Sequence, residues 1–573
     1  MDFYFDGNTE QVKLSFEETQ KDGITYVKIC ADFAELTSPE EFAVCFDLEN
    51  RGAYSTWSPT LGGSRDLTYS GCARRTDSRF SCGTPVTALI DKWGDNCACL
   101  SLADCVTPTA LCTSIIEQNC HIKCQIRFFT RRVSPLTHYE TVLRIDRRKE
   151  NFCNVIRDVA SWWENECNYT PASVPDCAFD VVDSTWYSFH QKVYTHDLLK
   201  EFELSSKLGM KTVIIDDGWQ TSDNGGNYTY CGDWELAEDK IPDMRTLSDE
   251  IHKLGMKVMI WYTVPFLGKY SKCCEDWVEY CLDANKRYHD TFTFDPRYPE
   301  VSDYLVNIYA KAVKEWDLDG VKLDFIDYFE ITDHACEPDP RRDIDELKDG
   351  IEALLRRVHE ELTAIKPDIL IEYRQYYVGP AVRQYGNMMR VRDCAGDALV
   401  NRRSSIDLRL TNGGTAVHSD MIMWDYADIV ENAALQVYAT FYSVPQISVR
   451  IYDLPGDHKK MLEYLLKVQN EYADVLLHGD ISAYDPAEGY SYIAASKGER
   501  EFITEYVSRP AAVAAKDSVL VNCTADTSLV VKLAGARYCT VKTCTGETVF
   551  EGKLEKGLDE IDIPLCGIAF FAE

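Results

Sequence analysis

The sequence lacks several features that would place it in familiar classes of protein. No stretch of about 18 apolar residues occurs, so we expect no membrane-spanning helix. The opening residues contain no basic start, apolar run or cleavage signal, and we expect no signal peptide. No Gly-x-Gly-x-x-Gly or P-loop motif is present. The 11 histidines form no His-x-His or His-x-x-x-His pair, and no Cys-x-x-Cys pair recurs, so we expect no metal and no cofactor.

Positive charge is also scarce. Lysine and arginine number 60 against 93 aspartates and glutamates, which gives a formal net charge of -33. Nucleic acids and anionic membranes would be repelled, so we expect neither as a partner. A neutral substrate suits this composition, although a merely soluble acidic protein would show the same excess.

Cysteine is abundant, but its 23 copies do not form a tidy disulfide framework. The count is odd, and the pairs Cys97/Cys99 and Cys273/Cys274 are too close for routine pairing. Thiols used as small core side chains are typical of a reduced compartment. We therefore expect a cytoplasmic protein, provided that no signal peptide has been removed.

The 573 residues exceed one ordinary domain and divide into three regions. Residues 1–172 contain many short alternating segments, such as Tyr26–Cys30 and His138–Ile145, which predict an N-terminal β-sandwich. Residues 481–573 again show short strands and turns, which predict a small C-terminal antiparallel β-sandwich.

Between these regions, residues 173–480 alternate strands with helices, which predicts a central (β/α)8 TIM barrel. The competing doubly wound sheet would favour fewer strands and a phosphate-binding turn. A helix near 427–441 is expected to follow the last strand. The strands are expected, in order, at 181–187, 211–215, 257–262, 291–294, 321–326, 368–373, 388–392 and 415–418.

Two charged residues on the expected fifth strand suggest chemistry. The strand period of two places Lys322 and Asp324 on the same side. They could form a buried ion pair, or a catalytic carboxylate beside a cation that keeps it ionised.

Polar and aromatic residues also follow most of the other expected strands, where barrel active sites lie. Carboxylates bind sugar hydroxyls and tryptophan faces pack on sugar C–H faces, so the sequence predicts a carbohydrate site. Three of these residues have structural alternatives: Asp217 as the start of a turn, Trp219 in the core, and His418 as a satisfied core histidine. The full set is Trp186, Asp216, Asp217, Trp219, Trp261, Lys322, Asp324, Glu372, Arg374, Arg392, Asp393, His418 and Asp420.

The domain order and three motifs resemble the α-galactosidases (melibiases) of glycoside hydrolase family 36, in clan D. Asp216-Asp217-Gly218-Trp219 is similar to the family's aspartate pair, which binds the 4- and 6-hydroxyls of galactose. Val321-Lys322-Leu323-Asp324 is similar to the Lys-x-Asp that carries the nucleophile, and the segment 392–397 to the motif that carries the acid/base.

The resemblance implies Asp324 as nucleophile and Asp393 as general acid/base. It implies substrate-binding roles for Trp186, Asp216, Asp217, Trp219, Trp261 and Asp397. We predict the same role for Lys322 and Arg374 from their positions at the strand ends. Two departures stand out. Residues 372–377 replace a Cys- and Gly-rich segment near the sugar's 2-position, and Arg297 is out of register with a family arginine.

We therefore expect a retaining, exo-acting α-galactosidase that acts on small oligosaccharides or glycosides. Lys322 should help to keep Asp324 ionised, and neighbouring carboxylates should raise the pKa of Asp393. An α-N-acetylgalactosaminidase or another α-glycosidase of the clan, a non-catalytic carbohydrate-binding barrel, and a metal-dependent hydrolase or isomerase stay open. A homo-oligomeric state also stays open.

Overall fold

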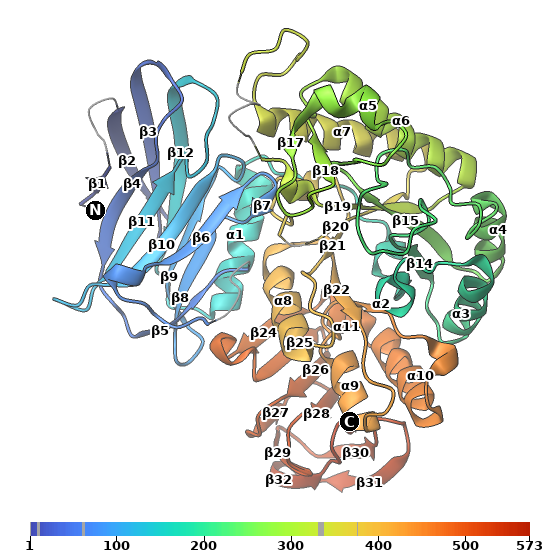
Figure 1. Ribbon diagram of the computed structural model, residues 1–573. Helices are drawn as coiled ribbons and strands as arrows, with labels where there is room; N and C mark the ends of the chain where they lie inside the picture. The colour runs from blue at the N-terminus through green and yellow to red at the C-terminus, as the bar shows by residue number, and fades with distance from the viewer. Residues whose placement is uncertain (1, 8–11, 60–63, 331–336, 375) are drawn as a thin grey trace.

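The computed structural model describes residues 2–7, 12–59, 64–330, 337–374 and 376–573. Three units follow one another along the chain: a β unit, a barrel surrounded by helices, and a second β unit (Figure 1). The predicted fold class, a central barrel flanked by two β units, is confirmed.

The N-terminal unit is a sandwich of two sheets whose apolar faces enclose one core, which includes Val27, Val44, Ile126 and Leu143. Its strands alternate between buried and exposed positions where one face meets solvent. The first sheet has the order β1 (Tyr4–Asp6), β4 (Phe42–Leu48), β11 (Ile122–Phe128), β10 (Thr109–Ile115), β6 (Arg74–Arg79) and β7 (Cys82–Gly83). The second has the order β2 (Val12–Lys21), β3 (Ile24–Thr37), β12 (Leu136–Asp146), β9 (Asn96–Leu102), β8 (Val86–Asp91) and β5 (Ala53–Trp57).

Helix α1 (Phe152–Glu166) connects the sandwich to the barrel. Asn151 caps its start by accepting a hydrogen bond from the Cys153 backbone N–H. The indole Nε1 of the buried Trp163 donates to the Leu102 carbonyl at 2.8 Å, which fixes the helix on the second sheet.

The barrel is a closed parallel sheet, and its strands are almost wholly buried, as expected for strands covered by side chains on both faces. Its strands, in order around the barrel, are β13 (Val182–Ser184), β14 (Thr212–Ile215), β15 (Lys257–Thr263), β19 (Gly320–Asp324), β20 (Leu370–Arg374), β21 (Met388–Arg390), β22 (Ala416–Ile422) and β23 (Val444–Ile447).

One expected barrel strand is wrong. The segment Thr291–Phe294 forms β18, which pairs antiparallel with β16 (Phe266–Gly268) and β17 (Cys281–Ala284) outside the barrel. Its Thr-Phe-Thr-Phe alternation suits an antiparallel strand with two different faces. The barrel closes instead through β23, which pairs with β22 and β13 and which the sequence analysis missed.

Helices cover the outside of the barrel, and each packs its apolar face against the strands. Helix α6 begins with Pro299, a favoured first-turn residue, and ends at Trp316; the next residue, Asp317, adopts the left-handed conformation. No helix in the described part of the chain is long and apolar enough to cross a membrane. The main helices are α3 (Thr195–Lys207), α4 (Met244–Lys253), α6 (Pro299–Trp316), α7 (Leu347–Ile365), α8 (Ala398–Thr411), α9 (Val430–Tyr438) and α10 (Gly456–Glu471).

The C-terminal unit consists of two sheets packed face to face. Most neighbours run antiparallel, but the pairs β26/β28 and β27/β29 run parallel, so the unit is mixed and not purely antiparallel. The larger sheet has the order β24 (Asp480–Tyr484), β25 (Tyr492–Lys497), β26 (Arg500–Glu505), β28 (Asp517–Asn522), β33 (Ile568–Ala572), β30 (Arg537–Lys542) and β31 (Thr548–Leu554). The smaller has the order β27 (Ala511–Val513), β29 (Ser528–Leu533) and β32 (Gly557–Asp562).

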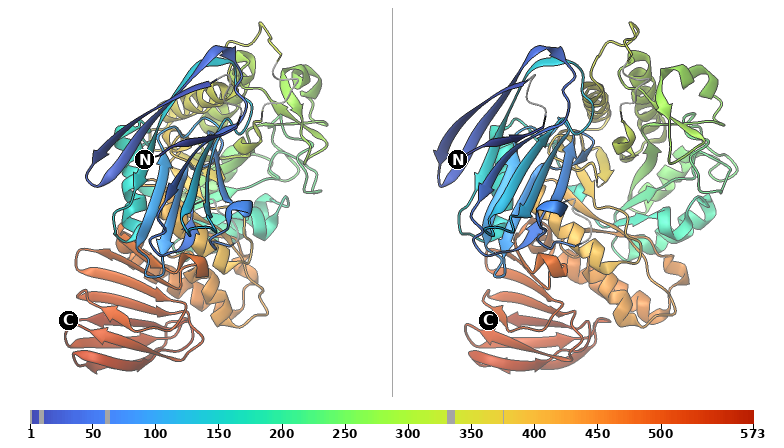
Figure 2. Two further views of the ribbon diagram at one scale, coloured as in Figure 1. Left: turned by 90° about the vertical axis from the view of Figure 1, so that its left-hand side faces the viewer. Right: turned by 60° about the vertical axis from the view of Figure 1, so that its left-hand side comes forward.

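The three units meet at Asp407 of α8. Its buried carboxylate accepts hydrogen bonds from Trp57 Nε1 of the N-terminal unit at 2.9 Å and from Tyr490 Oη of the C-terminal segment. It also pairs with the guanidinium of Arg65, which is itself fully buried. Figure 2 shows the two β units lying next to each other beside the barrel.

Candidate active site

Asp324 lies buried at the carboxyl end of β19, and hydrogen-bond donors surround its carboxylate. Oδ1 accepts from Phe325 N at 2.7 Å, from Arg374 Nε at 2.5 Å and from Tyr377 Oη at 2.5 Å. Oδ2 accepts one hydrogen bond, from Trp261 Nε1 at 3.1 Å. Phe325 adopts a left-handed backbone (φ 68°), an unusual conformation that turns its N–H back towards the carboxylate.

The charges around Asp324 keep it ionised. Burial alone would raise the pKa of this carboxyl, but Arg374 and then Lys322 lower it well below its usual range. The positive charge of Lys322 therefore helps to keep Asp324 ionised, as expected, although it acts without a direct hydrogen bond. Arg374 contributes more to lowering the pKa.

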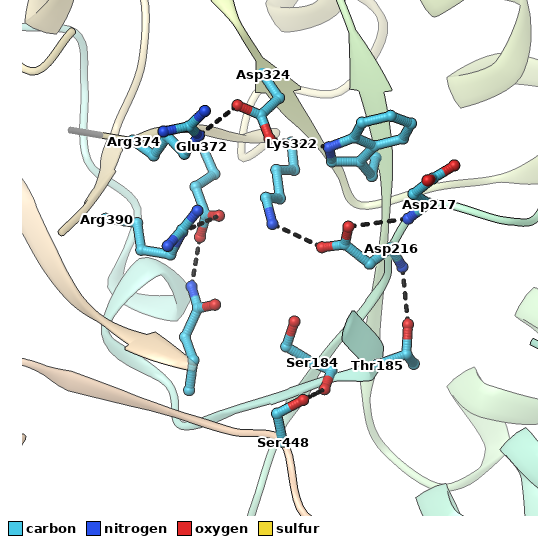
Figure 3. A network of polar contacts seen from close by, with 12 residues as sticks. Ser184, Thr185, Asp216, Asp217, Lys322, Asp324, Glu372, Arg374, Arg390 and Ser448 are labelled. Atoms are coloured by element: carbon cyan, nitrogen blue, oxygen red, sulfur yellow. Dashed lines mark hydrogen bonds and ion pairs between the residues drawn. The ribbon is translucent and has the colours of Figure 1, made fainter. Parts of the chain in front are cut away.

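Lys322 makes its direct contact with a different aspartate. Its Nζ donates to Asp216 Oδ2 at 2.6 Å, and both side chains are buried (Figure 3). The Asp216 backbone N–H donates to Thr185 Oγ1 at 2.9 Å, and its Oδ1 accepts from Asp217 N at 2.9 Å. Asp216 therefore ties together the ends of β13, β14 and β19.

Asp217 is held by two side-chain amides, Gln191 Nε2 at 2.8 Å and Gln220 Nε2 at 2.6 Å. Burial raises the pKa of its carboxyl to about 7, although both amides favour the charged form. Gly218 follows with φ 122°, and a Cβ there would lie 2.5 Å from Gln191 Cα. Only glycine fits at this turn, which explains the Asp-Asp-Gly sequence.

Asp393 follows β21, and its side chain is 57% exposed on the cavity wall. Its Oδ1 lies 2.9 Å from Arg390 Nη1. Partial loss of hydration at the cavity wall and the charge of Asp324 both act to raise the pKa of Asp393, but Arg390, Arg374 and Lys322 outweigh them and lower it. The expectation of a raised pKa for Asp393 is therefore wrong, because the cations prevail over the neighbouring carboxylates.

Arg390, which the sequence analysis did not select, anchors the loop that carries Asp393. This buried guanidinium lies 2.5 Å from Asp420 Oδ1. Asp420 also accepts from Cys394 N at 2.6 Å and from Tyr187 Oη at 3.0 Å. A strand period of two places Arg390 on the same side as Arg392, so the alternation in 388–392 was a usable signal.

A cavity of about 320 Å³ opens over these residues. Eight of the predicted residues line it: Trp186, Asp216, Asp217, Trp261, Lys322, Asp324, Arg374 and Asp393. Arg392, which the sequence placed at a strand end, lines it as well. The cavity also has seven lining residues that were not predicted from the sequence: Tyr228, Arg287, Tyr288, Phe325, Tyr376, Arg390 and Met421. Several of these come from connecting segments, where no strand pattern marks them.

Two predicted substrate-binding residues lie elsewhere. Trp219 is fully buried, donates from Nε1 to the Trp261 carbonyl at 2.9 Å and stacks beside Trp234 in the core. Asp397 is exposed and caps α8 by accepting from Val400 N at 2.9 Å. Neither lines the cavity, so the structure gives Trp219 a packing role and Asp397 a capping role.

Two other strand-end residues point into the barrel interior. Glu372 is fully buried and accepts from the Gln446 side chain, and burial raises its pKa. His418 lies 2.8 Å from the Ala178 carbonyl, and burial lowers its pKa to about 4. His418 is thus the satisfied core histidine that one interpretation of the sequence expected.

Within the described residues, one group has the spacing to hold a metal ion: Asp249, His252 and Asp317. It lies outside the cavity, and Lys366 Nζ already pairs with Asp317 at 3.1 Å. The lysine competes with a cation there, so the group gives no support for a metal centre.

The fold and the site together define a class, the multidomain barrel glycoside hydrolases, whose chemistry uses a pair of carboxylates. Residues 179–377 match the melibiase family model. The match covers about a third of the chain and the first five barrel strands, and the predicted resemblance to the family 36 α-galactosidases is confirmed.

Solved structures share the architecture. A variant of the family 36 α-galactosidase AgaA from Geobacillus stearothermophilus, in complex with raffinose, superposes with a TM-score of 0.66 at 14% identity, over 98% of this chain and 81% of that one. The α-galactosidase from Lactobacillus brevis superposes with a TM-score of 0.65 at 13% identity, over 100% of this chain and 85% of that one. At these identities the likeness concerns the fold.

Curated relatives match over short segments. The A type blood α-D-galactosamine galactosaminidase of Flavonifractor plautii is 28% identical over 176 residues, 27% of this chain and 15% of that protein. α-Galactosidase Mel36A of Lactobacillus acidophilus is 25% identical over 150 residues, 25% of this chain and 19% of that protein. The matched segments span less than a fifth of either relative.

Proposed function

We propose that this protein is a retaining, exo-acting α-galactosidase that removes terminal α-galactosyl residues from small oligosaccharides or glycosides. The observation that carries the proposal is the environment of Asp324. This carboxylate is buried and ionised, has four hydrogen-bond donors, and shares one cavity with a second carboxylate, Asp393. A retaining glycosidase needs such a pair.

In the first step, Asp324 attacks the anomeric carbon. Oδ2 is the better attacking atom, because Oδ1 already accepts three hydrogen bonds and Oδ2 accepts one. The new bond joins Oδ2 to the anomeric carbon as the glycosidic bond breaks. The leaving oxygen takes a proton from Asp393, which the surrounding cations leave protonated in only a minority of the free enzyme. The product is a covalent glycosyl-enzyme.

In the second step, Asp393 takes a proton from water while the water oxygen attacks the anomeric carbon, and the bond to Asp324 breaks. In the glycosyl-enzyme, Asp324 is an ester and has no charge. It therefore no longer raises the pKa of Asp393. Arg390 and Arg374 remain and favour the carboxylate form of Asp393 that the base role requires.

The preference for galactose is attributed to Asp216 and Asp217, which the family resemblance pairs with the 4- and 6-hydroxyls. Both line the cavity in fixed orientations. Raffinose, the ligand in the complex of the AgaA variant, is a small oligosaccharide of the kind expected as substrate.

The second candidate is an α-N-acetylgalactosaminidase. It is favoured by Arg374 and Tyr377, which stand in the segment expected near the sugar's 2-position and bind the nucleophile directly. The name of the Flavonifractor plautii relative refers to galactosamine, a sugar that also differs from galactose at the 2-position. We also propose a reducing, cytoplasmic location, supported by the 22 free cysteines among the described residues.

A panel of 4-nitrophenyl α-glycosides tests the proposal. The α-galactoside should be hydrolysed faster than the α-N-acetylgalactosaminide and the α-glucoside. Proton NMR of the first product should show the α-anomer of galactose, because two displacements retain configuration. A first-formed β-anomer would contradict the retaining mechanism, and preference for the N-acetylgalactosaminide would favour the second candidate.

A further inference from the structure

The cavity is lined by more positive than negative side chains, whereas the whole chain is strongly negative. The whole sequence has a net charge of -33. The cavity, however, is lined by five cationic side chains and four carboxylates; the cations are Arg287, Lys322, Arg374, Arg390 and Arg392. Because the pKa of Asp217 is about 7, this carboxyl is only partly ionised at neutral pH and adds less than one negative charge to the cavity. A cation-rich cleft on an acidic protein concentrates anionic ligands locally.

Three of the cations are engaged with carboxylates of the site. Lys322 pairs with Asp216 at 2.6 Å, Arg374 with Asp324 at 2.5 Å, and Arg390 with Asp393 at 2.9 Å. These pairs belong to the machinery described above. Their charges are therefore largely balanced before a substrate arrives.

Arg287 differs from these three. Its Nη1 donates to Tyr328 Oη at 2.7 Å, and its Cζ lies 5.4 Å from the centroid of the Tyr288 ring. Within the residues that the structure describes, no carboxylate lies within ion-pair distance of Arg287. The side chain is exposed, so its remaining N–H groups can meet a ligand at the mouth of the cavity.

An aromatic wall joins Arg287 to the reacting centre. Tyr288 and Phe325 lie with ring centroids 6.1 Å apart, and Arg374 Cζ lies 5.0 Å from the Phe325 centroid. Arg374 in turn contacts Asp324. A ligand bound over Asp324 would thus meet aromatic faces first and the Arg287 guanidinium further along the same wall.

We propose that Arg287 selects glycosides that carry an anionic group, a carboxylate or a sulfate or phosphate ester, at the mouth of the cavity. The inference rests on the proposed glycosidase function and names a substrate class for it. A guanidinium suits these anions because its planar N–H groups match two oxygens at once. The anion could stand on the leaving group or on the sugar ring, and the two sources are separable by experiment.

The test compares matched ligands by calorimetry. The first pair is 4-carboxyphenyl 1-thio-α-galactoside and its methyl ester, which differ in charge on the leaving group. The second pair is methyl 1-thio-α-galactoside 3-sulfate and methyl 1-thio-α-galactoside, which differ in charge on the sugar. Thioglycosides resist hydrolysis, so binding is measured without turnover. We expect the anionic member of one pair to bind about fivefold more tightly, equivalent to ~1 kcal/mol.

Variants assign the preference to a residue. Arg287→Gln should reduce the anion-to-neutral binding ratio to about one, and 0.5 M salt should reduce it in the unmodified protein as well. Lys286→Gln is the matched control, because it removes the same charge from the neighbouring residue, which does not line the cavity. This control should leave the ratio unchanged.

Each outcome bears on the inference. A preference that appears in one pair and disappears only in Arg287→Gln supports it and identifies the position of the anion. Equal binding in both pairs, or a preference that survives Arg287→Gln, overturns it. Turnover of 4-nitrophenyl α-galactoside is measured separately, so a failure of the glycosidase proposal is distinguishable from a failure of the anion site.

Discussion

Lys322 Nζ lies 2.6 Å from Asp216 Oδ2, although Asp324 stands two residues further along the same strand. The lysine therefore links β19 to β14, and the direct cationic partner of Asp324 is Arg374 at 2.5 Å. One strand thus supplies the cation that pairs with Asp216 and the carboxylate that we propose as the nucleophile. Because each carboxylate has its own cationic partner, Asp216 and Asp324 can both be ionised within one cavity.

The first prediction concerns the nucleophile. Asp324→Ala should lose nearly all turnover of nitrophenyl α-galactoside, because no covalent intermediate can form. Added azide should restore part of the rate by entering the vacated space, and the product should be the β-galactosyl azide, detected by NMR. Asp327→Asn is the control: Asp327 lies three residues on, outside the cavity lining, and this variant should retain turnover. Wild-type-like turnover in Asp324→Ala would remove Asp324 from the mechanism.

The second prediction concerns Asp217. Since burial raises the pKa of its carboxyl to about 7, protonation below that pH removes the charge that should bind a hydroxyl. We expect kcat/KM to fall as the pH drops through about 7. Asp217→Asn should lower kcat/KM by the equivalent of ~2–4 kcal/mol and should abolish this ionisation.

Circular dichroism of Asp217→Asn should match that of the unmodified protein. An unfolded variant would instead indicate that Asp217 serves the turn at Gly218. An unchanged pH profile in a folded variant would assign the ionisation to another group.

The site was predictable where side chains follow strands directly. Asp216, Asp217, Lys322 and Asp324 stand at the ends of β14 and β19, and strand periodicity alone places them in one region. Arg287 and Tyr288 escaped prediction because they lie between β17 and β18, in a connection whose path depends on tertiary packing.

The sequence was sufficient to predict a (β/α)8 barrel but not to locate its last strand, β23. The short strand Val444–Ile447 contains a proline, which usually argues against a central strand, and it was missed. Trp219 was misplaced for a different reason. Sequence distance from a strand end does not tell whether an indole faces the cavity or the core.

The third prediction separates the two aspartates of the segment 392–397. Asp393→Ala should slow natural α-galactosides far more than nitrophenyl or fluoride substrates in the first step, because poor leaving groups need a proton. Asp397→Ala should affect both substrate types little and equally. It should lower the free energy of unfolding by ~1 kcal/mol, since it removes the cap of α8. Steady-state kinetics across leaving groups measures this, and leaving-group dependence in Asp397→Ala alone would reverse the assignment.

The fourth prediction concerns the junction of the three units. Asp407→Ala leaves the guanidinium of Arg65 buried without its carboxylate, which should lower the free energy of unfolding by ~3–5 kcal/mol. Urea unfolding followed by tryptophan fluorescence measures the change. The matched control is Asp77→Ala, which breaks an exposed pair with Arg75 and should cost less than ~1 kcal/mol. Equal effects of the two variants would contradict a structural role for the junction.

The fifth prediction concerns two buried carboxyls behind the barrel wall, Asp183 and Glu201. Asp183 accepts from Ser205 Oγ, and Glu201 Oε1 accepts from Ile451 N at 2.6 Å. Burial raises the pKa of Asp183 to about 7 and that of Glu201 to about 8, where the neighbouring charge adds to the effect. Both values exceed those of the unfolded chain, near 4.

The stability that these groups contribute is therefore fully present below about pH 4 and is lost as the pH rises through 7 to 8. Asp183→Asn cannot ionise, so its free energy of unfolding should fall less between pH 5 and pH 8 than that of the unmodified protein. Glu203→Gln is the control on the same helix: Glu203 is exposed, and Lys207 lowers its pKa, so its removal should leave that slope unchanged. Urea unfolding at pH 5, 6.5 and 8 measures the three slopes. A slope in Asp183→Asn as steep as in the unmodified protein would show that this pair does not set the alkaline loss of stability.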